Sequence, residues 1–176
     1  MQIIDRTPIA TGDPVIITEM QENMRLDADL VTCAHAYSQT AAREIETYCA
    51  LALLDQTITC ATDNLPGCDV ALPIGPVAAD ATITVDLIEM DGTTTPGGRL
   101  RVTYPAGYGA TSGGIPADLR KAICDLSARL YDFRASGKAA AMPAATARIC
   151  ARYRRVAGST VAGSTTRQST ETKSYD

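Results

Sequence analysis

The stretch RLDADLVTCAHAYSQTAAREIETYCALALL, residues 25–54, carries the longest unbroken hydrophobic period in the chain. Its apolar residues recur at steps of three and four, which is the spacing of one face of an α-helix. They are Leu30, Ala34, Tyr37, Ala41, Ile45, Tyr48 and Ala52. Asp27 is a suitable N-cap, and Arg43 and Glu46 are expected to pair on the opposite, solvent-facing side. The stretch predicts a long helix on whose apolar face the other elements pack.

The segment before this helix predicts little regular structure. Residues 1–17 contain Pro8, Gly12 and Pro14 and are expected to form an extended lead-in rather than an element. Thr18 is a cap residue, and the helix-compatible sequence after it predicts one or two turns of helix packed across the start of the long one.

After the long helix, the pattern changes to that of β-strands. QTITC, residues 56–60, is β-branched and alternating and predicts a short strand. Apolar and polar residues also alternate at 83–88 and at 100–104, with DGTTTPGG at 91–98 between them. This pattern predicts an antiparallel β-hairpin within residues 81–105 that has a long tip.

Two more helices are predicted in the C-terminal third. Pro116 suits a first helical position, and the residues after it keep an apolar helical spacing as far as Ser136 and Gly137. These apolar residues are Leu119, Ile123, Leu126, Leu130 and Phe133. Pro143 opens a shorter helix with Ile149, Tyr153 and Val156 on one side, and this helix needs a partner surface to be stable.

The elements together predict a mainly α protein of the α+β class, a helical bundle of two long and two short helices with a small β-hairpin. A chain of 176 residues is one domain by size. The expected organisation is the lead-in at 1–17, a helical adaptor body at 18–138, a docking helix at 139–155 and a flexible Ser/Thr-rich tail at 156–176.

Composition limits the possible function classes. The six cysteines are spaced without a CxxC pair, which argues against a zinc site and predicts free thiols in a reducing compartment. No signal peptide or apolar run of about 20 residues is present, so a soluble protein that is not exported is expected. The net charge is −4, yet residues 139–176 hold six Arg or Lys against two acidic residues, so an acidic body carries a basic arm.

Residue patterns that would support catalysis are weak. The single histidine, His35, precedes Ser38 by three residues on the predicted helix, but a hydrolase would also need an orienting group and an oxyanion site. Gly107 and Gly109 lack the GK[ST] that completes a phosphate-binding loop, so a flexible connector is the better interpretation. Carboxylates occur without metal-ligand spacing. We therefore predict no catalytic residue, no metal and no cofactor.

Arginines form the best candidate functional patch. Arg148, Arg152 and Arg155 share one side of the last helix, and Arg154 adjoins them. A solvated helix face is one interpretation of such a row. A binding role is the other, and it is favoured by a charge opposite to that of the body and by the shortness of the helix.

The order of motifs resembles the small head-to-tail connector, or adaptor, proteins of tailed bacteriophages and of phage-like gene transfer particles. The motifs that carry the resemblance are AAREIETYCALALLDQTI (41–58), LPIGPV (72–77), MDG (90–92), RLRVTYPAGYG (99–109), IPADLRKAICDLSARLYDFR (115–134) and ARYRR (151–155). They span about residues 15–155, and the pattern ends at Val156.

This resemblance implies a structural protein that is assembled in the bacterial cytoplasm and located at the portal vertex of a virion or phage-like particle. Such proteins form a ring of twelve that joins the portal protein to a stopper or tail-side connector and leaves a channel for double-stranded DNA. The acidic body agrees with a passage to which DNA does not stick, because non-specific phosphate binding requires Lys and Arg. No membrane partner is implied.

Two surfaces are assigned as expected interaction sites. Portal docking is expected from residues 139–155, namely Arg148, Ile149, Arg152, Tyr153, Arg154 and Arg155. Contact with a neighbouring subunit or the tail side is expected from the hairpin tip, namely Asp91, Gly92, Thr93, Thr94 and Thr95. Deletion of 139–176 is expected to abolish attachment while the body stays folded. The alternative function is a nucleic-acid-binding accessory protein that uses the Arg-rich arm.

Overall fold

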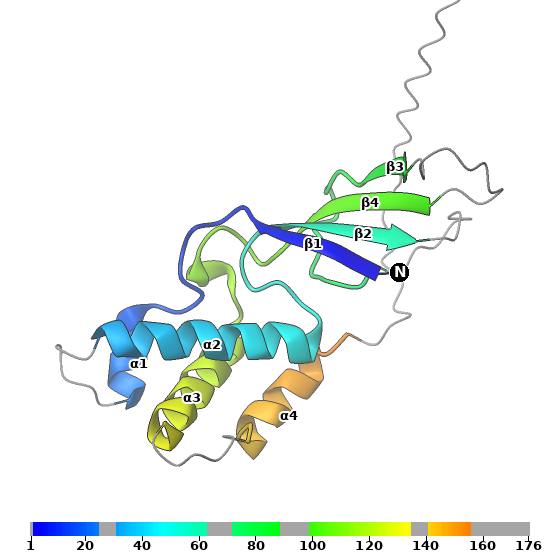
Figure 1. Ribbon diagram of the computed structural model, residues 1–176. Coiled ribbons are helices and arrows are strands. Elements are labelled where there is room, and N and C mark those ends of the chain that lie inside the picture. The colour runs from blue at the N-terminus through cyan, green and yellow to red at the C-terminus, as the bar shows by residue number, and fades with distance from the viewer. Residues whose placement is uncertain (1, 25–30, 63–71, 89–98, 135–140, 156–176) are drawn as a thin grey trace, which may run out of the picture.

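A computed structural model of the chain describes residues 2–24, 31–62, 72–88, 99–134 and 141–155 (Figure 1). The elements in chain order are β1 (Gln2–Pro8), α1 (Ile17–Met24), α2 (Val31–Cys49), β2 (Gln56–Thr62), β3 (Thr84–Ile88), β4 (Arg99–Ala106), a 3₁₀ turn (Ser112–Gly114), α3 (Ala117–Phe133) and α4 (Ala144–Tyr153). The predicted α+β class is confirmed. Within these ranges, no helix has the length and apolar character needed to cross a membrane.

The strands form one antiparallel sheet in the order β1-β2-β4-β3. The predicted hairpin is present as β3 and β4, and the QTITC strand is the start of β2. The hairpin is not a small separate unit, however, because β4 also pairs along its length with β2, with Ile58 opposite Tyr104 and Cys60 opposite Val102. The tip predicted at 91–98 lies outside the described residues.

The prediction that residues 1–17 lack a regular element is wrong, because Gln2–Pro8 forms strand β1. β1 pairs with β2 and places Arg6 opposite Ile58. As an edge strand it is exposed along nearly its whole length, and Ile3 and Ile4 are 40% and 54% exposed. An exposed edge strand does not need the alternation of apolar and polar residues by which strands are predicted. Its partner strand also lies about 50 residues away along the chain, so no local pattern indicates the pairing.

The helices form a second layer around α2. Figure 1 shows that the sheet lies on one side of α2, while α3 and α4 lie on the opposite side of α2. Helix α1 packs against both α2 and α3. The predicted stripe is confirmed at Ala34, Ala41 and Ile45, which are fully buried. Tyr48 was also placed on this stripe, but it is 40% exposed, and Cys49 takes the buried position beside it. The predicted N-cap, Asp27, lies outside the described residues.

A second, smaller core lies under the sheet. Ile58, Cys60 and Val102 on the inner sheet face pack against Ile74 of the proline-rich segment 72–77. The hydroxyl of the fully buried Tyr104 donates to the Ile74 carbonyl oxygen and accepts from the Ile74 N–H, both at 3.2 Å. These bonds fix the extended segment against the strands, since buried polar groups need partners.

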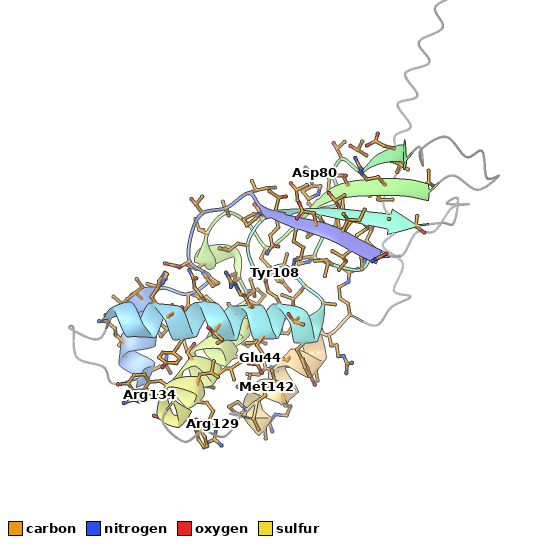
Figure 2. The ribbon with its side chains drawn as sticks, in the orientation of Figure 1. Glu44, Asp80, Tyr108, Arg129, Arg134 and Met142 are labelled. Carbon is orange, nitrogen blue, oxygen red and sulfur yellow. The ribbon has the colours of Figure 1, made fainter. Side chains whose placement is uncertain are left out.

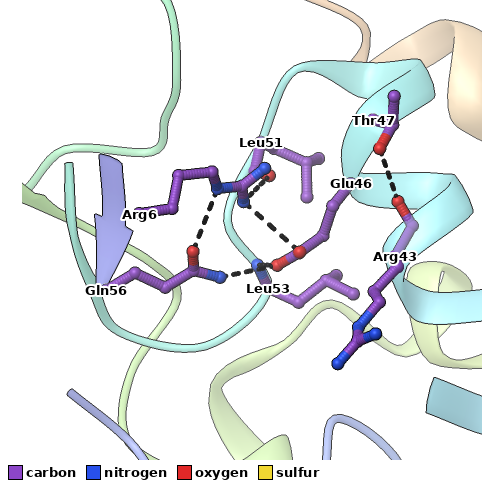
Figure 3. Close-up of polar contacts among 7 residues, drawn as sticks. All are labelled: Arg6, Arg43, Glu46, Thr47, Leu51, Leu53 and Gln56. Atoms are coloured by element: carbon purple, nitrogen blue, oxygen red, sulfur yellow. Dashed lines mark hydrogen bonds and ion pairs between the residues drawn. The ribbon is translucent and has the colours of Figure 1, made fainter. Parts of the chain in front are cut away.

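Glu46 connects the helical layer to the sheet (Figure 3). Its Oε1 accepts from the Leu53 N–H at 2.8 Å and from the Gln56 side chain at 2.9 Å, while its Oε2 pairs with Arg6 of β1 at 3.3 Å. Arg6 also donates to Gln56 Oε1 and to the Leu51 carbonyl oxygen. The prediction that Glu46 pairs with Arg43 in water is therefore wrong: the Glu46 side chain is only 14% exposed, and Arg43 lies away from this network.

The glycine-rich connector after β4 is held in place, which corrects the prediction of a flexible link. Its backbone bonds to both layers, with Gly107 N–H donating to the Pro76 carbonyl and Gly109 accepting from the Asp55 N–H. Gly107 has a φ of 153°, and a Cβ there would lie 2.6 Å from the Asp55 backbone. The glycine is needed for close approach. The next residue, Tyr108, lies between the sheet and the helices (Figure 2).

The end of α2 offers a stability prediction. Ala50 has a φ of +54°, and the Leu51 N–H donates to the Glu46 carbonyl oxygen at 3.1 Å, which is the pattern of a Schellman C-cap. Glycine takes this backbone conformation without the Cβ strain. We expect Ala50→Gly to raise the free energy of unfolding by about 0.5–1 kcal/mol. Ala36→Gly, at an exposed position inside the same helix, should lower it by about 1 kcal/mol. Urea unfolding of both variants checks the pair, and a destabilised Ala50→Gly variant would contradict the assignment.

Candidate interaction surface

The α4 helix is packed on the body rather than projecting from it. It begins after Pro143, as predicted. Cys150 and Thr146 are fully buried, and Ile149 and Tyr153 pack against the core between α2 and α3. Met142 joins this core from the segment before α4 (Figure 2). The partner surface that this short helix needs is therefore supplied by its own chain, and α4 does not depend on another protein for a surface on which to fold.

Polar bonds anchor the C-terminal end of α4 to the first turn of α3. The Tyr153 hydroxyl donates to Asp118 Oδ1 at 2.6 Å, and the Arg152 guanidinium lies 3.2 Å from Asp118 Oδ2. The carboxylate sits near the N-terminus of α3, where the helix dipole favours negative charge. The hydrogen bond to Asp118, together with some burial, raises the pKa of Tyr153 to about 12. Asp118 thus holds two of the residues that the sequence assigned to docking.

Because of this hydrogen bond, removing the hydroxyl oxygen of Tyr153 should measurably lower the stability of the fold. We expect Tyr153→Phe to lower the free energy of unfolding by about 1–2 kcal/mol, the contribution of a hydrogen bond to a charged group. The folded-state pKa lies above the unfolded value of about 10, so the contribution is complete below pH 10 and is lost as pH rises toward 12. Unfolding curves of both proteins at pH 8 and pH 11 check this. Equal stability at pH 8 would contradict the anchor.

The outward side of α4 carries its arginines. Arg148 and Arg154 are exposed, and the Arg154 guanidinium lies over the ring of Tyr48, 5.4 Å from its centroid. Arg155 is half-buried: its N–H donates to the Cys49 carbonyl oxygen, and its guanidinium occupies the space where a Cβ on Gly75 would lie. Tyr48 and Gly75 were not assigned by sequence, because each lies far along the chain from α4 and no local pattern links them.

The predicted docking residues therefore divide into two groups. Ile149 and Tyr153 face the core and hold the helix, whereas the arginines form its outward surface, with Arg152 tied to Asp118. The second predicted surface, Asp91, Gly92, Thr93, Thr94 and Thr95, lies outside the described residues.

The His35 and Ser38 pair does not form a hydrolytic site. Ser38 Oγ donates to the His35 backbone carbonyl at 3.1 Å and is buried, so it does not contact the imidazole. The His35 ring instead lies 2.8 Å from Asp13 Oδ1. Asp13 also lines an open hollow of about 380 Å³ whose other polar side chains are the hydroxyls of Thr18, Thr111 and Ser112. A nucleophile bonded to its own helix backbone has no activating base.

Four of the cysteines in the described ranges are free, as predicted, and buried. They are Cys49, Cys60, Cys124 and Cys150. Burial raises the pKa of Cys49 to about 12 and that of Cys124 to about 11, so both thiols stay protonated at neutral pH. Among the residues that the structure places, no group of three or more His, Cys, Asp or Glu side chains is arranged to hold a metal ion. These thiols act as small apolar core residues.

The described surface combines ion pairs within the chain, such as the partly buried Arg6–Glu46 pair and the Arg152–Asp118 pair, with exposed isoleucines on and beside β1. No protein-family model matches the chain, and no curated protein is significantly similar to it.

Solved structures identify the class of the protein. The fold matches a chain in the neck of an empty gene transfer agent particle, determined with C6 symmetry, with a TM-score of 0.67 and 27% identity. It also matches a chain in the virion of a native particle, with a TM-score of 0.62 and 26% identity, and one in a native neck determined with C12 symmetry, with a TM-score of 0.62 and 27% identity. These alignments cover 89–90% of this chain and 99% of each matched chain.

The matches confirm the resemblance to head–tail connector proteins that the order of motifs indicated. They place the protein among structural components of phage-like particles and not among enzymes.

Proposed function

We propose that this protein is a head–tail adaptor that forms a ring of twelve in the neck of a phage or phage-like particle. The ring joins the portal to a stopper or tail-side protein and leaves a channel for double-stranded DNA. The observation that carries the proposal is the likeness over nearly the whole chain to neck proteins, one of them in a neck with C12 symmetry. The acidic body suits a channel wall, because the 18 acidic residues within 1–138 outnumber the 10 lysines and arginines there and repel the phosphates of DNA.

Portal docking is assigned to the outward face of α4, within residues 139–155. Arg148, Arg152 and Arg154 are exposed cations of this face, and Arg152 pairs with Asp118. Arg154 with Tyr48 makes an Arg–aromatic pair of the kind enriched at protein interfaces. Because Ile149 and Tyr153 hold the helix rigidly on the body, these cations are presented without a folding cost on binding. The hairpin tip, residues 91–95, is assigned to the neighbouring subunit or the tail side.

Charge reversal of the exposed arginines tests the docking assignment. Arg148→Glu with Arg154→Glu should reduce attachment of this protein to portal-bearing heads by about tenfold or more while leaving its thermal midpoint unchanged. Arg101→Glu with Arg129→Glu is the matched control, because it makes the same charge change at exposed positions on β4 and α3. Sedimentation of heads with bound protein measures attachment. Equal attachment of the two double variants would refute the assignment.

The same purified protein separates this proposal from nucleic-acid binding. Three of the four arginines have partners within the chain, since Arg152 pairs with Asp118, Arg154 lies over the Tyr48 ring and Arg155 packs against Gly75. An adaptor should show no strong affinity for a DNA duplex. A binding constant that falls with salt at a log–log slope of several units would instead favour the nucleic-acid-binding alternative.

A further inference from the structure

The two outer strands of the sheet carry most of the exposed apolar side chains. Seven large hydrophobic side chains are exposed in the part of the chain that the structure describes, and five lie on or directly beside β1 and β3. On the β1 side they are Ile3, Ile4 and Ile9, which are 40%, 54% and 56% exposed, and on the β3 side Ile83 and Val85, which are 39% and 45% exposed. Apolar side chains gathered on two opposite edges indicate surfaces that other chains cover.

Each edge strand carries one exposed charged side chain, Asp5 on β1 and Asp86 on β3, and neither strand carries a lysine. Natural edge strands are often protected by lysines or inward-pointing charges. The register of β1 shifts between Ile3 and Asp5, and Ile4, which lies between them, is 54% exposed. The one cation of β1, Arg6, turns inward to Glu46. On β3, Val85 is exposed although its register partner, Val102, is buried.

Strand direction makes the two edges complementary. Each neighbouring pair in the order β1-β2-β4-β3 is antiparallel, so β1 and β3 run in opposite directions. A second copy placed beside the first in the same orientation therefore brings its β3 antiparallel to β1. A ring requires this kind of contact, between two different surfaces on opposite sides of one protomer.

We propose that neighbouring copies in the ring join edge to edge, with β1 of one copy pairing antiparallel with β3 of the next. Backbone hydrogen bonds supply the contact, and the isoleucines of β1 cover Val85 and Ile83 across it. This inference rests on the proposed ring, and it identifies the lateral surface of each subunit as the sheet edges and not the helical layer.

Disulfide trapping tests the edge contact in assembled necks of the full-length chain. Ile4→Cys is combined in turn with a cysteine substitution at each residue of β3, Thr84–Ile88, which covers every register that places Ile4 opposite this strand. A bond within one chain is excluded, because β1 and β3 are three strand spacings apart, about 14 Å, while disulfide Cα atoms lie within about 7 Å. Oxidation should give a ladder of covalent multimers for one pair above the others. Wild type and the single Cys variants should stay monomeric in denaturing gels.

The possible outcomes test the edge-to-edge contact separately from the proposed ring. Rings seen by imaging without a ladder from any pair would overturn the edge contact and leave the proposed function standing. Dimers from Ile4→Cys alone would also overturn it, because they indicate pairing of β1 with β1. A particle neck without a ring of this protein would overturn the proposed function, whatever the gels show.

Lysine substitutions give a second measurement that does not depend on register. Ile4→Lys and Val85→Lys should each reduce ring formation by about tenfold or more, because a charge on the edge opposes strand addition. Both side chains are already exposed, so circular dichroism and the thermal midpoint should stay unchanged. Thr103→Lys on the outer face of the central strand β4 is the matched control. Normal rings from both edge variants would contradict the proposal.

Discussion

Replacing Glu46 by alanine is expected to lower the free energy of unfolding by roughly 2–4 kcal/mol. The carboxylate is mostly buried and serves three partners: the Leu53 N–H, the Gln56 side chain and Arg6. Removing it takes the carboxylate acceptor from the Leu53 N–H and the Gln56 side chain and leaves Arg6 with only its bonds to Gln56 Oε1 and the Leu51 carbonyl oxygen, in a site where water only partly replaces the carboxylate. Denaturant unfolding with a linear extrapolation measures the change.

Two further variants show whether this loss comes from the network. Glu46→Gln keeps an acceptor oxygen near the Leu53 N–H and should lose about half as much as the alanine variant. Arg43→Ala, on the exposed side of the same helix, should change stability by less than about 0.5 kcal/mol. If the Glu46→Ala and Arg43→Ala variants were equally stable, Glu46 would behave as a surface residue. Its assigned role in connecting the helices to the sheet would then be refuted.

A chain that ends at residue 140 is expected to lose most of its stability. It lacks α4, and with it the buried side chains of Cys150 and Thr146, the packing of Ile149 and the Tyr153 bond to Asp118. Full burial of a large apolar side chain contributes about 1.5–3 kcal/mol, and the Tyr153 bond about 1–2 kcal/mol, so the summed loss over these residues is a large share of the 5–15 kcal/mol typical of a domain. The expectation that the body stays folded without residues 139–176 is therefore revised.

The matched truncation ends at residue 156 and keeps α4. It should retain the thermal midpoint of the full chain, because the described contacts of the core involve residues up to 155. Calorimetry of both truncations measures the difference. A cooperative transition of unchanged midpoint in the shorter chain would contradict the packing of α4 on the body.

The sequence could predict those parts of the fold whose signal is local. The periodicity of α3 identified Leu119, Ile123 and Leu126, which are all fully buried. The alternation that identified β3 and β4 also needed only neighbouring residues, since a hairpin pairs segments that are close along the chain. Local prediction failed for β1, because an exposed edge strand takes its structure from a distant partner.

Polar residues account for most of what the sequence could not show. Glu46 has a side chain typical of surfaces, and its partners Leu53, Gln56 and the distant Arg6 make a mostly buried position favourable. In α4, Thr146 and Cys150 are more buried than Ile149 although all share one face, because α4 packs against both α2 and α3 and this packing decides which position is deepest. The role of Asp118 in anchoring α4 could not be predicted either, because its hydrogen-bond partner Tyr153 is 35 residues away along the chain.

The central claim is that this chain is a ring-forming spacer between portal and tail. Imaging of purified particles at the portal vertex, without imposed symmetry and with this protein labelled, tests it most directly. The account predicts a closed ring of twelve copies between the portal and the tail-side protein. A portal vertex that is complete in particles lacking this polypeptide, or a neck that contains it outside a ring, would contradict the account.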